Sequence, residues 1–125
     1  MAQISESEMS IPIQYAMTYP KRLRGLLPPY DFVNNPRLDF YKSDTDKFPC
    51  LKLAYEALFS GGTCPCYMNA ANEVLVNRFL NKKISWNSIG EKLQPLMEKF
   101  NNSQDVSLES ILATDQLGRE QALNA

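Results

Sequence analysis

Hydrophobic residues recur at helical spacing over the last two thirds of the chain. Apolar positions three and four residues apart predict four helices, over about residues 46–60, 64–81, 86–100 and 108–122. Gly61 and Gly62 end the first of these helices. Thr63, Ser85 and Ser107 precede the other three as N-cap candidates. The connections are short, so we predict a small antiparallel four-helix bundle.

The predicted helices differ in pattern. The helix over 64–81 is apolar on nearly every side, which places it in the middle of the bundle. Pro95 lies inside the third helix and is expected to kink or split it, at a cost of about 3 kcal/mol if the helix stays regular. Gly118 and the polar end of the fourth helix suggest fraying there.

The first third of the chain reads as mostly irregular and holds five of the eight prolines. Met1–Ser5 resembles the end of a strand, although nothing nearby predicts a partner strand. A short helix is predicted over 10–18 with Ser10 as its cap, followed by an extended connector over 21–35. The segment 37–42 is compatible with a short strand. We therefore predict a mainly α chain with two parts, residues 1–43 and a helical domain over 44–125.

The composition is that of an ordinary globular protein, with 44% hydrophobic and 22% charged residues. A formal net charge of −1 argues against a nucleic-acid partner bound through bulk electrostatics. No apolar run is long enough to span a membrane, and the first residues do not read as a signal peptide. Three cysteines, an odd number, suggest reduced thiols. We expect a cytoplasmic location.

The chain has no histidine, which removes Ser-His and Cys-His nucleophile pairs and any zinc site that needs an imidazole. Cys50, Cys64 and Cys66 invite a metal or redox hypothesis. A structural zinc site requires four ligands, and redox pairs prefer two residues between their cysteines, whereas a single residue separates Cys64 from Cys66. The pattern favours cysteines that pack as small hydrophobes.

Asn69, Asn72 and Glu73 form the most distinctive polar group. Their spacing places them on one helix face, while Ala70 and Ala71 permit close approach of a neighbouring helix. This face could line a polar pocket, or it could form a hydrogen-bonded network that fixes helix register. The residues alone favour the network.

Two further clusters have alternative interpretations. Glu6 and Glu8 could act as a pair of acid–base carboxylates, but glutamates near a chain end are more often solvated. Lys21, Arg22 and Arg24 could bind a phosphate, but basic residues after a helix more often lie in solvent. The residues by themselves therefore predict no complete active site.

Three stretches, in this order, resemble the C-terminal part of the 1-deoxy-D-xylulose 5-phosphate reductoisomerase family. SEMSIPIQYAMTYPKR (residues 7–22) is similar to the family's P-D-M-[RK]-x-P-I-x-Y-A stretch and the Y-P-x-R that ends it. DKFPCLKLAYEALFSGG (46–62) resembles R-[FY]-P-C-L-x-L-A-x-E-A, and NAANEVLVNRFLNKKISW (69–86) resembles L-N-A-A-N-E-x-x-V-x-x-F-L. The resemblance covers nearly the whole chain.

The resemblance implies an oxidoreductase of non-mevalonate isoprenoid biosynthesis. The full-length family enzyme uses NADPH and a divalent metal, magnesium or manganese, to convert its substrate into 2-C-methyl-D-erythritol 4-phosphate. Its nucleotide domain and metal ligands precede the region that resembles this chain. The resemblance therefore implies no catalytic residue and no metal ligand here, and no cofactor bound to this chain alone. The expected partners are the rest of the same enzyme and a second subunit, with no nucleic acid and no membrane.

The resemblance carries one cofactor-binding position over to this chain. The methionine of the family's P-D-M motif lies by the nicotinamide ring and matches Met9. The chain departs from the motif at Ser7, Glu8 and Ser10. The alternative role for Met9 is packing at the start of a helix.

The leading hypothesis is a C-terminal portion of this reductoisomerase, comprising the last strand of the catalytic domain, a connector and a helical domain that supports the active site. By itself it is expected to be inactive. The alternative is a stand-alone helical interaction or scaffold module, which would need a permanent partner for its exposed apolar surfaces.

Overall fold

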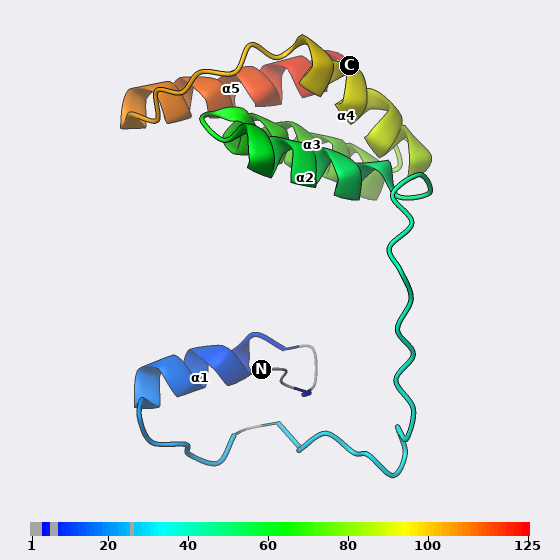
Figure 1. Cartoon of the computed structure of the whole chain (residues 1–125), viewed down its shortest axis with the longest axis vertical. Coiled ribbons are helices and arrows are strands. Elements are labelled where there is room, and N and C mark those ends of the chain that lie inside the picture. Colours follow the sequence, from blue (N-terminus) through cyan, green and yellow to red (C-terminus); the bar gives the residue numbers. More distant parts are fainter. Residues whose placement is uncertain (1–3, 6–7, 26) are drawn as a thin grey trace. The chain divides into compact units, whose positions relative to one another are not determined.

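The computed structural model describes the chain except residues 1–3, 6–7 and 26. The chain divides into two compact units, Met1–Tyr41 and Lys42–Ala125. Every regular element among the described residues is a helix (Figure 1). None of these helices has both the length and the apolar character that crossing a bilayer requires. The prediction of a mainly helical chain is confirmed.

Among its described residues, the first unit contains a single helix, α1 (Ser10–Thr18), which matches the predicted helix. Ser10 was expected to cap this helix, and that prediction is wrong. Met9 occupies the N-cap position without a side-chain hydrogen bond. The carboxylate of Glu8 instead accepts a hydrogen bond from the backbone N–H of Ser10 at 3.2 Å. The acidic side chain of Glu8 thus satisfies one of the free N–H groups at the start of α1.

The predicted strand over 37–42 does not form. All six residues are exposed and irregular. Their alternating pattern suits a strand, but a strand needs a neighbouring strand to pair its backbone groups, and the described residues provide none. Of the predicted strand end at Met1–Ser5, Met1 to Gln3 lie outside the described residues, and Ile4 and Ser5 are irregular.

The second unit contains the four predicted helices, with ends shifted by a few residues. They are α2 (Pro49–Ser60), α3 (Cys64–Leu80), α4 (Asn87–Lys99) and α5 (Leu108–Asn124). Helix α3 contacts each of the other three, while α4 also contacts α2 and α5 (Figure 1). The helix that is apolar on nearly every side is therefore central in this unit, as its pattern predicted.

The core of this unit is built from aliphatic side chains of all four helices. Its buried members are Leu53, Ala71, Leu75, Ile89, Leu93 and Ala122. Leu75 and Leu93 are completely buried. Burial of one such leucine stabilises the fold by about 1.5–3 kcal/mol.

Helices α3 and α5 approach closely because the residues between them are small. Ala70 and Ala71 are completely buried, as the sequence analysis anticipated for a close helix contact. Gly118 lies opposite them, where a Cβ atom would stand 2.9 Å from the carbonyl oxygen of Tyr67 and 3.1 Å from the Cβ of Ala70. The prediction that Gly118 marks fraying is therefore wrong: Gly118 is buried and α5 continues to Asn124.

Pro95 does not split α4, which runs unbroken from Asn87 to Lys99. The missing N–H of a proline leaves the carbonyl four residues earlier without a helical partner. Pro95 and Glu91 are both exposed, so water can hydrate that carbonyl. Exposure is why this helix tolerates a residue that was expected to divide it.

Candidate functional site

Met9, the predicted cofactor-binding residue, lies at the start of α1 with 68% of its surface exposed. Its thioether is free to pack against a flat apolar ring. A phosphate group would fit this end of α1 poorly, because the Glu8 carboxylate already accepts the hydrogen bond of the Ser10 N–H. The described surroundings of Met9 thus leave its thioether exposed and do not suit binding of a nucleotide phosphate.

A groove of about 970 Å³ runs beside α1 within the first unit, lined by α1 and by residues up to Phe32. The guanidinium of Arg22 lies 4.3 Å from the centre of the Tyr15 ring, a cation–π contact. The side-chain amide of Gln14 donates to the backbone carbonyl of Arg24 at 3.1 Å. Lys21, Arg22 and Arg24 are exposed, which favours the solvated interpretation of the basic cluster over a phosphate site.

Of the predicted pair of carboxylates, Glu6 lies outside the described residues. Glu8 is exposed and is engaged by the backbone of Ser10. The described residues therefore give no support to a paired acid–base site at this position.

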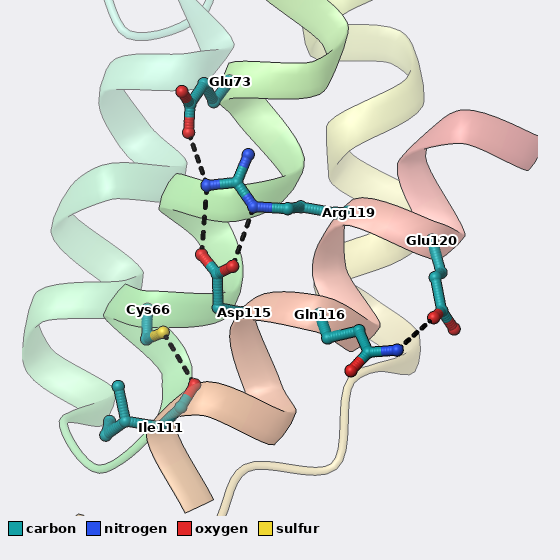
Figure 2. A network of polar contacts seen from close by, with 7 residues as sticks. All are labelled: Cys66, Glu73, Ile111, Asp115, Gln116, Arg119 and Glu120. Carbon is teal, nitrogen blue, oxygen red and sulfur yellow. Dashed lines mark hydrogen bonds and ion pairs between the residues drawn. The ribbon is translucent and has the colours of Figure 1, made fainter. Parts of the chain in front are cut away.

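A polar network joins α3 to α5 in the second unit (Figure 2). Nη2 of Arg119 donates to Glu73 at 2.7 Å, and Nε of Arg119 donates to Asp115 at 2.7 Å. The hydrogen bonds that Arg119 donates to Asp115 and Glu73 raise its pKa, so the guanidinium stays charged. These side chains are about 40–50% exposed, so the ion pairs fix helix register more than they add stability. For Glu73, the network interpretation of the sequence is supported.

Asn69 and Asn72 do not join this network. Asn69 is exposed, and Asn72 lines a separate apolar groove between α2, α3 and α4. Neither side-chain amide forms a hydrogen bond with another described residue. The residues that were predicted to share one face of α3 therefore do not act together. Glu73 pairs with α5, whereas Asn72 lies on the side of α3 near α2.

Asn102, which the sequence analysis missed, joins the loop before α5 to the turn between α2 and α3. Its side-chain oxygen accepts from the Cys64 N–H at 3.0 Å and from the Thr63 hydroxyl at 3.3 Å. Its side-chain nitrogen donates to the carbonyls of Ser60 and Gly61 at 3.3 and 3.2 Å. The side-chain amide of Asn102 thus forms hydrogen bonds with both the end of α2 and the start of α3.

Thr63 occupies the N-cap position of α3, as the sequence predicted, but it does not act there as a side-chain cap. Its side chain makes no cap hydrogen bond and instead accepts from the Ser103 N–H at 3.1 Å. Gly62 has φ +57, and a Cβ there would lie 2.2 Å from the Ser103 carbonyl oxygen, so this close contact requires glycine. No local signal identifies Asn102, because its partners are about forty residues away.

The three cysteines are free thiols. The Cys66 thiol donates to the carbonyl oxygen of Ile111 at 3.5 Å (Figure 2). Burial raises the pKa of Cys50, Cys64 and Cys66, so each thiol is held in its neutral form at neutral pH. Among the described residues, no group of three or more Cys, Asp or Glu side chains is placed to hold a metal ion. The cysteine-based metal or redox hypothesis gains no support from them.

Comparison with known proteins identifies the family. Residues 4–121 match the DXP reductoisomerase C-terminal domain. The 1-deoxy-D-xylulose 5-phosphate reductoisomerase of Protochlamydia amoebophila is 54% identical over 98% of this chain and 32% of its own length. The enzyme of the same name from Clostridium botulinum is 44% identical over 96% of this chain and 31% of its own length. The chain thus spans about a third of the curated relatives it matches.

Solved structures agree with this match. The 1-deoxy-D-xylulose 5-phosphate reductoisomerase from Zymomonas mobilis in complex with NADPH is 36% identical, with a TM-score of 0.85 over 99% of this chain and 33% of that one. A DOX-P reductoisomerase in complex with magnesium is 33% identical, with a TM-score of 0.80 over the same shares. The resemblance deduced from three sequence stretches is confirmed: the chain belongs to the DXP reductoisomerase C-terminal domain family.

Proposed function

We propose that this chain is the C-terminal portion of an NADPH- and divalent-metal-dependent reductoisomerase that converts 1-deoxy-D-xylulose 5-phosphate to 2-C-methyl-D-erythritol 4-phosphate. The observation that carries the proposal is the family match over residues 4–121, combined with coverage of only about a third of each relative. Relatives solved with NADPH and with magnesium support the choice of cofactors, with manganese as a second candidate metal.

In this proposal the chain does no chemistry by itself. The groups that hold the metal and the nucleotide phosphates come from the part of the polypeptide that precedes it. Residues 1–43 supply the end of the catalytic domain and a proline-rich connector, and residues 44–125 form an antiparallel four-helix bundle that supports the site. The complete enzyme is proposed to be a cytoplasmic homodimer.

Met9 is the residue of this chain that we propose to contact the cofactor. When bound, the nicotinamide supplies the hydride for the reduction. Met9 offers an exposed thioether beside which a flat ring can pack, and packing of this kind positions the ring without forming a hydrogen bond. The Glu8 carboxylate keeps nucleotide phosphates away from the same helix end.

The proposal is tested by joining this chain to the N-terminal two thirds of the Protochlamydia amoebophila relative, in place of that protein's own matched region. NADPH oxidation is then followed with 1-deoxy-D-xylulose 5-phosphate and magnesium or manganese. We expect turnover by the joined polypeptide and none by the 125-residue chain or by the N-terminal two thirds alone. A folded but inactive joined polypeptide, or turnover by the isolated chain, would contradict the proposal.

Met9→Ala in the joined polypeptide is expected to raise the KM for NADPH several-fold and to change the KM for the sugar phosphate little, because only the nicotinamide contact is lost. Met17→Ala is the matched control, since Met17 lies near the other end of α1 and is 82% exposed. Steady-state kinetics with each substrate varied measure both constants. Equal effects of the two substitutions would assign Met9 a packing role instead.

A further inference from the structure

Helix α2 has a second apolar face in addition to the one that it buries. Leu53 and Ala57 point into the core. Five other apolar residues follow helical spacing along a different side of the same helix, beginning one residue before it: Phe48, Leu51, Ala54, Tyr55 and Leu58. We call these five residues the α2 face. A helix at the surface of a globular domain normally has one apolar stripe and a polar remainder.

The α2 face is largely exposed. Leu58 is 66% exposed, Tyr55 54% and Phe48 43%. The charged residues of α2 do not interrupt it, because Lys52 and Glu56 lie on a third side of the helix, where they form an ion pair at 3.9 Å. The α2 face is therefore a continuous uncharged surface about three helical turns long, unlike the scattered apolar residues that are normal on protein surfaces.

A groove of about 250 Å³ lies at the N-terminal end of the α2 face, and Phe48 belongs to both. The groove is mostly apolar, lined by Cys50, Val76 and Ile89 among others. Trp86 forms its rim together with Phe48, their ring centres 6.2 Å apart in an edge-to-face arrangement. The groove is large enough to hold one or two apolar side chains. Asn72 in its lining leaves an amide free to pair with a backbone group of whatever fills it.

One exposed leucine of the same unit, Leu123, lacks this setting. Leu123 of α5 is 62% exposed, close to the value for Leu58. The residues three and four positions before Leu123 are Glu120 and Arg119, so no apolar stripe surrounds it. Leu123 provides a comparison in which exposure is matched and the apolar surroundings are absent.

We propose that the α2 face and its groove are the docking surface for the preceding part of the same polypeptide, which inserts an apolar side chain into the groove beside Phe48 and Trp86. The inference rests on the proposed function. Its occupant is inferred from length and charge. The chain matches a C-terminal domain that makes up about a third of its relatives. The five residues of the α2 face are uncharged, and the charged residue that lines the groove, Lys47, lies over the Phe48 ring with its Nζ 5.7 Å from the ring centre. The apolar area left bare on α2 is then covered within one chain.

Thiol labelling tests this inference without relying on activity. Leu58→Cys and Leu123→Cys are made separately in the 125-residue chain and in the joined polypeptide described above. Each variant is treated with a maleimide for short times, and circular dichroism verifies its helical content. The native thiols are buried or half-buried with raised pKa values, so they react slowly, and the unsubstituted protein gives their background rate.

We expect the two engineered thiols to react at similar rates in the 125-residue chain. In the joined polypeptide, the thiol of Leu58→Cys should react roughly tenfold or more slowly, while that of Leu123→Cys stays fast. Hydroxyl-radical footprinting of unsubstituted proteins provides a second readout, in which Tyr55 and Trp86 become protected on joining. This readout needs no substitution that could perturb folding.

Three outcomes would overturn the inference. One is an unchanged rate for Leu58→Cys in the joined polypeptide, and another is equal slowing of both thiols. The third is slowing in the 125-residue chain that grows with its concentration, which would assign the surface to a second copy. Activity is recorded separately. An active joined polypeptide with a fast Leu58→Cys thiol refutes the docking surface alone, whereas an inactive one with a protected thiol refutes the proposed function alone.

Discussion

The two units of the chain use apolar residues in opposite ways. In the second unit, each of α2, α3, α4 and α5 buries at least two residues and contributes at least one of them to a shared core. In the first unit, α1 buries none, and no described residue of 1–41 is buried. Since burial of apolar surface is the main favourable term in folding, the second unit has its own source of stability and the first does not.

The first unit nevertheless contains large apolar residues. Phe32, Val33, Phe40 and Tyr41 are each more than 60% exposed. A segment with this composition is suited to lie against another protein surface, and it cannot stabilise itself alone. One chain can thus hold an independently stable unit and, next to it in sequence, a segment whose composition is suited to a larger assembly.

The largest expected effect comes from the core of the second unit. Leu75→Ala should lower the free energy of unfolding by about 3 kcal/mol, because Leu75 is completely buried and a cavity remains. Guanidinium unfolding followed by Trp86 fluorescence measures it, and Trp86 is the only tryptophan, so the signal reports on the second unit alone. Leu80→Ala is the control: Leu80 is 66% exposed, and its substitution should change little. Equal effects would mean that the second unit lacks the core described above.

The next largest effect is expected at Asn102. Asn102→Ala should cost about 2 kcal/mol, because it removes the partner of the Cys64 N–H and of two carbonyls at the end of α2. The same fluorescence-detected unfolding measures the loss. Asn101→Ala, at an exposed neighbour, should be nearly neutral. An Asn102→Ala variant as stable as the parent would show that the loop does not hold these helix ends.

Local sequence patterns were informative about the helices of the second unit. The four helices of the second unit and the central place of α3 follow from apolar spacing, which is a local property. Asn102 could not be found in this way, because it acts on residues about forty positions earlier. Gly118 was misinterpreted because its meaning depends on the partner helix: only the structure places it against Ala70.

The first unit was harder to predict for a related reason. Apolar and polar residues alternate over segment 37–42 as they do in a strand. A strand forms only if a second strand lies beside it, and local sequence does not specify that neighbour. Among the candidate site residues, Asp115 and Arg119 were predictable in principle from their i, i+4 spacing, whereas the bond from Arg119 to Glu73 was not. The role of Met9 came from the family resemblance and stays a prediction.

Alkaline pH should produce a smaller effect in the second unit. Burial raises the pKa of the Cys64 thiol above its ordinary value of 9.0 and that of Tyr67 above 10.0. The folded state therefore holds these protons more tightly than the unfolded state. Stability is full below pH 9.0 and declines as pH rises through the raised values. Unfolding curves between about pH 8 and about pH 11, roughly one unit on either side of these ordinary values, measure the decline. Cys64→Ala should flatten its lower part, and an unchanged curve would contradict this assignment.

The smallest effect is expected in α1. Ile11→Ala should leave the unfolding of the 125-residue chain unchanged, because no residue of α1 is buried. In the joined polypeptide the same substitution should lower the midpoint of thermal unfolding. The reason is that the first unit is proposed to pack there against the rest of the catalytic domain. Differential scanning calorimetry on both proteins makes the comparison. A clear loss of stability in the 125-residue chain would show that the first unit has a core of its own.

We propose that this chain is part of a longer reductoisomerase. The size of the native polypeptide that contains this sequence tests that proposal most directly. An antibody raised against residues 42–125 is used to blot and to precipitate it from the cells in which it is made, and the precipitate is assayed for reductoisomerase activity. We predict a band about three times the mass of this chain, in agreement with the relatives it matches, and activity that depends on NADPH. A band only at 14.2 kDa, without activity, would contradict the account and favour a separate helical interaction module.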